Sequence, residues 1–258
     1  MNPKTNPTDT GMNRTGIATS PIDSGKLVKA AEDANTGGEI DGKALEAERV
    51  VWARESPPVG TVPPPGTLKG VAKAVLEKLQ GHKPTVFIDK LGERLAYERT
   101  GTRLYDALLA KHAVAHVHSG GPTRAEIMRI RDAEHRHMLV IRDAMQQLGA
   151  DPTAVTPCAD VIAVASLGWI QVLGDPRTTL TQCLDVMLSA EVTDTASWEL
   201  LCELADGLGF DDLAEQFRAC LVEEEEHVVT VRTWIANALS GQAGVAPTPP
   251  RPQPAAPR

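Results

Sequence analysis

Apolar residues recur at spacings of three and four along four long stretches of the chain, as on the buried face of an amphipathic helix. The four stretches begin at Phe87, Ile127, Leu180 and Leu213. Sustained alternation of apolar and polar residues, which would indicate strands, is almost absent. A shorter helical segment is expected at Ala159–Leu173. The pattern predicts an all-α fold built on four long helices.

Prolines mark the expected boundaries of the helical domain. Of 19 prolines, eight lie in residues 1–66 and six in 241–258, and the other five lie between predicted helices. We expect 1–66 to be a disordered or weakly ordered extension with one short helix near Gly42–Arg54. Residues 67–240 form the predicted bundle domain, beginning with a short helix at Leu68–Leu79. Residues 241–258 are expected to be a Pro-rich disordered tail.

Glycines and an aspartate indicate where the long helices end or begin. Gly149 and Gly207 stand where a glycine often follows the last turn of a helix. Asp211 is the expected N-cap of the fourth helix. The connection from Ala150 to Pro176 is long enough to travel the length of a bundle.

A carboxylate stands at the centre of each predicted apolar face, and two of the four begin a Glu-x-x-His sequence. The residues are Glu98, Glu134 with His137, Glu191, and Glu224 with His227. Residues three apart share one face of a helix, and a chain of this composition contains fewer than one such pair by chance. Four carboxylates in one core repel one another unless cations lie between them, and no lysine lies on these faces. Oxygen and imidazole ligands suit iron or manganese, so the pattern favours a metal cluster.

The spacing of these carboxylates also predicts the connectivity of the helices. In an antiparallel pair, two residues at one height are equally far from the turn. The midpoint of Glu191 and Glu224 falls on a Gly-Leu-Gly sequence, and that of Glu98 and Glu134 falls at His116, in a segment that leads to a proline. We therefore expect two antiparallel pairs, with the second and third helices parallel.

This ligand pattern resembles that of the ferritin-like di-iron carboxylate proteins, in which two helices supply one Glu each and two supply Glu-x-x-His. The resemblance covers about Val86–Leu239 and is similar in ligand order to bacterioferritins and rubrerythrins. It implies a ferritin-like four-helix bundle with a long crossover connection between helices two and three. It also implies two metal ions per chain, iron or alternatively manganese, held by the six residues named above.

The resemblance implies roles for further residues. The bridging carboxylates of bacterioferritins correspond to Glu134 and Glu224. Rubrerythrins carry another acid three residues after the third-helix Glu, where Asp194 stands, which implies a seventh metal-binding residue. Bacterioferritins have a tyrosine near the metals where this chain has Tyr105, which implies a catalytic role. The chain departs from both families: His135 replaces the haem-binding methionine, and no Cys₄ rubredoxin-type domain is present.

Composition and charge exclude several classes of function. The net charge of −8 and the pI near 5.4 argue against nucleic-acid binding. No apolar run approaches the ~18 residues of a membrane span, and the first 25 residues lack a secretory signal, so we expect a cytoplasmic protein that binds no membrane. The four cysteines form no C-x-x-C pair and are expected to be reduced, buried thiols: Cys158, Cys183, Cys202 and Cys220.

These expectations define one leading function and its alternatives. The leading prediction is a di-iron oxidoreductase that oxidises Fe(II) with O₂ or hydrogen peroxide, in a homo-oligomer. The alternatives are an iron-storage or iron-sequestering subunit and a non-catalytic bundle stabilised by metal. In a bundle without metal, the acids would pair with buried arginines, for which Arg94, Arg131 and Arg136 are candidates. Of the acidic run Glu223–Glu226, only Glu224 is expected to face inward.

Overall fold

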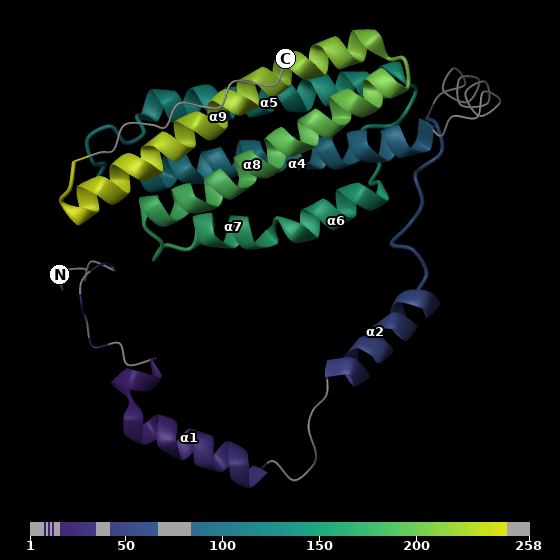
Figure 1. Ribbon diagram of the computed structural model, residues 1–258. Helices are drawn as coiled ribbons and strands as arrows, with labels where there is room; N and C mark the ends of the chain where they lie inside the picture. Colours follow the sequence, from purple (N-terminus) through teal and green to yellow (C-terminus); the bar gives the residue numbers. More distant parts are fainter. Residues whose placement is uncertain are drawn as a thin grey trace, which may run out of the picture. The chain divides into compact units, whose positions relative to one another are not determined.

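The computed structural model describes residues 8, 10, 12, 16–34, 42–66 and 84–246, in which every regular element is a helix and none is a strand. The chain divides into two units, Met1–Pro57 and Pro58–Arg258. The second unit contains the long helices, shown in Figure 1: α4 (Pro84–His112), α5 (Arg124–Gln147), α6 (Pro157–Ala165), α7 (Leu167–Gly174), α8 (Leu180–Gly207) and α9 (Asp211–Ala243). The all-α prediction is confirmed for the described residues.

The first unit contains helices without a core of their own. A 3-10 turn, η1 (Ile17–Thr19), precedes α1 (Pro21–Ala34) and α2 (Gly42–Glu55), and none of them buries a residue. Helix α2 agrees with the predicted helix at Gly42–Arg54, whereas α1 was not predicted. The predicted helix Leu68–Leu79 and the end of the tail lie outside the described residues.

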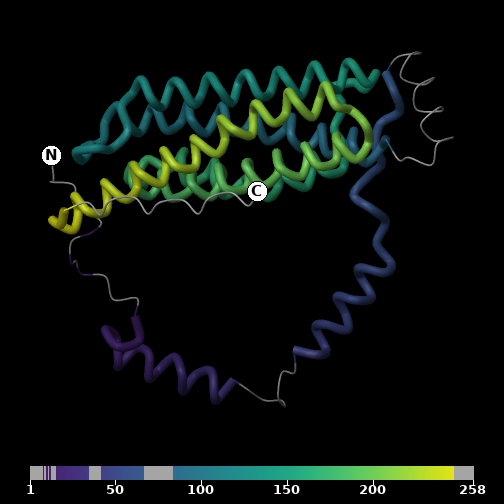
Figure 2. The backbone as a smooth tube through the Cα atoms, turned by 45° about the horizontal axis from the view of Figure 1, so that its top comes forward, coloured from purple at the N-terminus to yellow at the C-terminus, as the bar shows by residue number. Residues whose placement is uncertain are grey.

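Helices α4, α5, α8 and α9 pack side by side (Figures 1 and 2), with α4 and α9 each in contact with both α5 and α8. Arg131 of α5 contacts Asp106 of α4, whereas His137, further along α5, lies near Glu98, earlier in α4. The two helices are therefore antiparallel. The contacts between α8 and α9 show the same reversed order, and so do those between α4 and α8. Helices α5 and α8 consequently run in the same direction.

Helices α6 and α7 form the connection between α5 and α8 and pack on α4 and α8. Asp89 of α4 accepts a hydrogen bond from the main-chain nitrogen of Cys158, 2.9 Å away, in the first turn of α6. Gly92 allows this approach, because a Cβ at that position would overlap the side chain of Thr156. The single helical segment predicted at Ala159–Leu173 is two helices that meet at Ser166.

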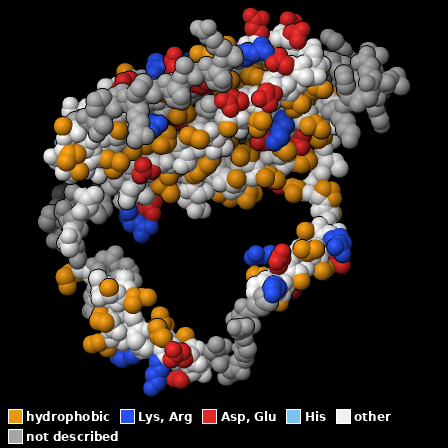
Figure 3. All heavy atoms as spheres, in the orientation of Figure 1, with side chains coloured by type: hydrophobic (Ala, Val, Ile, Leu, Met, Phe, Trp, Pro, Cys, Tyr) orange, Lys and Arg blue, Asp and Glu red, His pale blue; other side chains and the backbone are white. Residues whose placement is uncertain are grey.

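The expectation that no apolar run reaches the length of a membrane span is wrong for Pro157–Gly174. This stretch has 18 residues and a mean hydropathy of 1.4, and only 17% of it is buried. Its exposed side chains include Val161 and Ile170. Hydrophobic side chains are spread over the face of the second unit that Figure 3 shows. The stretch breaks at Ser166, however, into helices shorter than the ~20 residues needed to cross a bilayer, and both pack against the core.

The helix ends agree with the sequence at one glycine and differ at the α8–α9 turn. Gly149 follows the end of α5 with φ of 81°, a left-handed conformation that glycine adopts at little cost. Gly207 is instead the last residue of α8, and Gly209 takes the left-handed conformation with φ of 72°. Asp211 is the first residue of α9 rather than its N-cap, which is Phe210.

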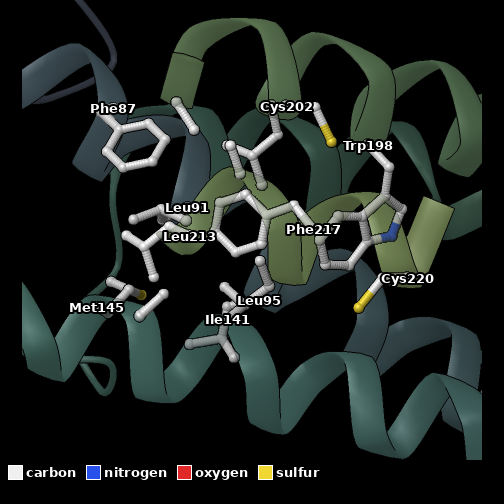
Figure 4. Close-up of a cluster of buried hydrophobic side chains, with 14 residues drawn as sticks. Phe87, Leu91, Leu95, Ile141, Met145, Trp198, Cys202, Leu213, Phe217 and Cys220 are labelled. Atoms are coloured by element: carbon white, nitrogen blue, oxygen red, sulfur yellow. The ribbon is translucent and has the colours of Figure 1, made fainter. Parts of the chain in front are cut away.

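The buried apolar residues form two clusters that lie on either side of a polar layer. Along α4, the first cluster contains Phe87 and Leu91 and the second contains Leu108, with Glu98 between them. The same alternation recurs along the other three long helices. Figure 4 shows the first cluster, where Trp198 packs edge-on against Phe217. The polar layer is therefore enclosed at both ends by hydrophobic packing.

Candidate metal centre

The six predicted metal ligands converge in this polar layer, and each is at most 3% exposed. They come from the middles of the four long helices: Glu98 from α4, Glu134 and His137 from α5, Glu191 from α8, and Glu224 and His227 from α9. Asp194 and Tyr105 are also buried beside them. The structure thus brings together every residue that the sequence assigned to the site.

Glu224 lies between the two histidines. Its Oε1 is 2.6 Å from His137 Nδ1, and its Oε2 is 3.2 Å from His227 Nδ1. Each histidine also faces further carboxylates: His137 Nδ1 is 3.9 Å from Glu98, and His227 Nδ1 is 3.5 Å from Glu134. Both Nδ1 atoms therefore point into one space that the carboxylates surround.

The ligand-type atoms form groups in which all members lie within 4.8 Å of one another. The groups are Glu134, Glu191, Glu224 and His227; Glu98, His137 and Glu224; and Glu98, Glu134, Asp194 and Glu224. Glu224 belongs to all three, and the two histidines belong to different groups. The layer is therefore a buried Glu/His cluster that could hold metal.

A buried arginine lies beside this cluster. Arg94 Nε is 3.2 Å from Glu98 Oε1, and Arg94 Nη1 is 3.1 Å from Asp194 Oδ1. The sequence analysis named three arginines as candidate partners for the acids, and only Arg94 is buried. Arg131 and Arg136 pair instead with acids nearer the surface. One arginine cannot neutralise five buried carboxylates.

Two aromatic side chains donate hydrogen bonds to the cluster. The Trp198 indole nitrogen donates to Glu98 Oε1 over 2.9 Å, and the Tyr105 hydroxyl donates to Glu191 Oε1. The sequence reasoning missed Trp198 as a site residue, although it lies one turn after Asp194 on the same predicted face. Each donor leaves the second oxygen of its carboxylate without a protein hydrogen bond.

Glu223 reaches the cluster from the surface, which corrects the expectation that only Glu224 of the acidic run faces inward. Its Oε2 lies 3.2 Å from His137 Nε2 and 2.9 Å from Arg136, and its side chain is 45% exposed. A carboxylate that accepts a hydrogen bond from Nε2 keeps the proton on that nitrogen and leaves Nδ1 free to bind a metal. The equivalent position before Glu134 is Ala133, so His227 has no such partner from α5.

Burial and mutual repulsion shift the protonation of the carboxylates. Burial raises the pKa of Glu98, Glu134 and Glu191 well above the ordinary value of 4.5, and neighbouring acids raise it further. Burial also raises the pKa of Asp194 to about 7, although Arg94 opposes the shift. Without cations, the folded protein therefore holds extra protons in this layer at neutral pH.

Glu224 and Tyr105 respond differently. Burial opposes ionisation of Glu224, but hydrogen bonds with His137 and His227 lower its pKa to about 2. Burial and the charge of Glu191 raise the pKa of Tyr105 well above 10. Glu224 is thus the carboxylate most ready to accept a cation, and Tyr105 keeps its proton.

The donor set and the space around it fit metal ions. One oxygen each of Glu98, Glu134 and Glu191 is buried without a protein hydrogen bond, which is costly unless a cation is bound. Gly101 of α4 provides room for the Glu134 carboxylate, because a Cβ there would overlap Glu134 Oε2. Four carboxylates with two imidazoles form an oxygen-rich donor set of the kind that iron and manganese accept.

Comparisons of the chain with models of protein families, with curated proteins and with solved structures give no match. The site is therefore interpreted from its own geometry.

Proposed function

We propose that the second unit is a ferritin-like four-helix bundle, with α6 and α7 as the crossover, that holds two iron ions and oxidises Fe(II) with O₂ or hydrogen peroxide. The observation that carries this proposal is the placement of Glu224 between two histidine Nδ1 atoms, inside a ring of buried carboxylates. The antiparallel pairing of α4 with α5 and of α8 with α9 supports the bundle.

The geometry suggests how the residues would share the ions. Glu98, His137 and Glu224 would hold one ion, and Glu134, Glu191, Glu224 and His227 would hold the other. Bound iron would supply the electrons for reducing the oxidant.

The protein's own groups would control hydrogen bonding and water around the ions. The Tyr105 hydroxyl donates to Glu191, and its raised pKa keeps it a proton donor on that side. Trp198 and Arg94 hold one oxygen of Glu98, which leaves the other free. The two apolar clusters exclude water from both ends of the layer.

Metal content together with a spectrum tests this proposal. Protein purified from iron-replete cells should contain about two iron ions per chain, since the six ligands carry four negative charges. Hydrogen peroxide added to the Fe(II)-loaded protein should change the near-ultraviolet spectrum, and a reductant should restore it through repeated cycles. Oxidation without turnover in a large assembly, seen by light scattering, would instead favour iron storage. Absence of bound metal contradicts the proposal.

The Glu223→Ala substitution should weaken the binding of only one of the two metal ions. Loss of the carboxylate that orients His137 is expected to lower the affinity of the His137 ion by about 10- to 100-fold. The affinity for the ion at His227 should be nearly unchanged, since the position equivalent to Glu223 is Ala133, which has no carboxylate. Stepwise calorimetric titration with Mn(II) measures both affinities. Glu225→Ala, in the same run but fully on the surface, is the matched control, and equal losses at both sites would refute the role of Glu223.

The Gly101→Ala substitution should impair metal binding without unfolding the protein. The added Cβ would displace the Glu134 carboxylate, whereas alanine itself favours helix by roughly 1 kcal/mol over glycine. We expect fewer than two ions per chain by elemental analysis, with unchanged helix content by circular dichroism. Gly207→Ala is a suitable control because a Cβ there meets no atom within 4 Å. Full metal content in Gly101→Ala would show that Glu134 is not held where the structure places it.

A further inference from the structure

Arg94 and Asp194 form a buried ion pair whose partners come from different helices, α4 and α8. Besides the 3.1 Å contact with Asp194 Oδ1, Arg94 Nη1 donates to the main-chain oxygen of Asp194 over 3.4 Å. The guanidinium lies over the Tyr97 ring, 4.2 Å from its centroid, and Tyr97 is fixed in turn by a 2.6 Å hydrogen bond to Ala190 O. The arginine is therefore held from several sides.

The net charge of the polar layer indicates a role for this ion pair. Five carboxylates are buried there, and Arg94 is the only buried lysine or arginine among the residues that the structure describes. With all five acids ionised and the histidines neutral, the layer carries a net charge of −4, which equals the charge of two divalent cations with opposite sign. Without Arg94, one negative charge would remain after two such ions had bound.

Asp194 has two alternative roles in this arrangement. Its carboxylate lies within 4.8 Å of oxygens of Glu98, Glu134 and Glu224, so it is close enough to be considered a ligand. Its Oδ1, however, already faces Arg94, and a buried guanidinium that loses its counter-ion is strongly destabilised. The four remaining carboxylates supply enough charge for two divalent ions without Asp194.

We propose that Asp194 is the counter-ion of Arg94 and not a metal ligand. Asp194 neutralises the buried guanidinium, so the four buried glutamates keep a net charge of −4 for two divalent cations. This inference rests on the proposed function, since it assumes that the other carboxylates bind metal. It distinguishes the chain from a site in which a seventh side chain binds the metal directly.

A double-substitution cycle tests the inference, with Mn(II) alone as the probe and free Mn(II) counted by electron paramagnetic resonance. Asp194→Leu leaves Arg94 without its partner, and the net charge of the carboxylates and arginine becomes −3. We expect the second Mn(II) to bind about 10- to 100-fold more weakly, an effect of the size seen when outer partners of ligands are removed. Arg94→Met combined with Asp194→Leu removes both charges and restores −4. A well-packed apolar pair in place of a buried ion pair often preserves stability.

The double variant decides between the two roles of Asp194. It should bind two Mn(II) ions with affinities within about threefold of wild type, because the two losses compensate. A double variant that binds only one ion, beside a wild type that binds two, would identify Asp194 as a ligand and overturn this inference alone. A wild type that binds no Mn(II) would overturn the proposed function as well. Circular dichroism of each variant establishes that it is folded.

Discussion

Replacing both central carboxylates, Glu134→Ala with Glu224→Ala, is expected to reduce bound metal from two ions per chain to none. Glu224 lies between the two histidines and Glu134 faces His227, and each of the two glutamates belongs to more than one group of candidate ligands. Without them, each ion would keep one histidine and one carboxylate, too few to compete with water. Helix content should change little, because both side chains point into the layer and neither caps a helix.

Elemental analysis, circular dichroism and thermal melting together measure this outcome. Added Fe(II) or Mn(II) should raise the melting temperature of wild type, since a ligand that binds only the folded state stabilises it, and should leave the double variant unchanged. Glu225→Ala with Glu226→Ala removes two charges from the exposed side of the same helix and serves as the matched control. Undiminished metal in the Glu134/Glu224 variant would disprove the assignment of the centre.

Lowering the pH from about 7 to 5 should stabilise the metal-free protein and destabilise the metal-loaded one. The raised pKa values of Glu98, Glu134 and Glu191 mean that the folded state binds more protons than the unfolded state above pH 4.5. Asp194, with a pKa of about 7, adds to this difference. Stability therefore rises as pH falls through this window. Glu224 acts in the opposite sense, but its lowered pKa affects stability only below about pH 4.5.

Metal binding reverses the pH dependence of stability, because protons compete with the ions for the same oxygens and nitrogens. Melting curves of the two forms should therefore converge as the pH falls. Parallel loss of stability in both forms would show that the carboxylates do not repel one another in the folded state. That result would contradict the proposed metal centre. Melting of the metal-free double variant offers a control, since it lacks two of the interacting acids.

The site residues could be predicted because their types and spacings suffice to place them. A carboxylate in the middle of an apolar helical face can avoid the core only by unwinding the helix, so periodicity alone directs Glu98, Glu134, Glu191 and Glu224 inward. Glu-x-x-His places each histidine on the face of its own glutamate. The position of each acid relative to the turns then brings all four to one height.

Other features depended on contacts between helices that no local pattern encodes. Arg94 lies one turn before Glu98, yet only the approach of α8 makes it the partner of Asp194. Glu223 has the composition of a surface residue, and it contacts His137 only because α5 and α9 pack closely there. Trp198 fits an apolar face, and its hydrogen bond to Glu98 required the neighbouring α4.

Periodicity and the cost of burying charge were enough to predict the four long helices, the polar layer and its ligand types. The groups that neutralise and orient those ligands, and the packing of α6 and α7 on α4 and α8 as separate helices, became known only from the folded chain. Sequence spacing fixes the direction of a side chain within its own helix, whereas the partner of that side chain depends on which helix packs against it.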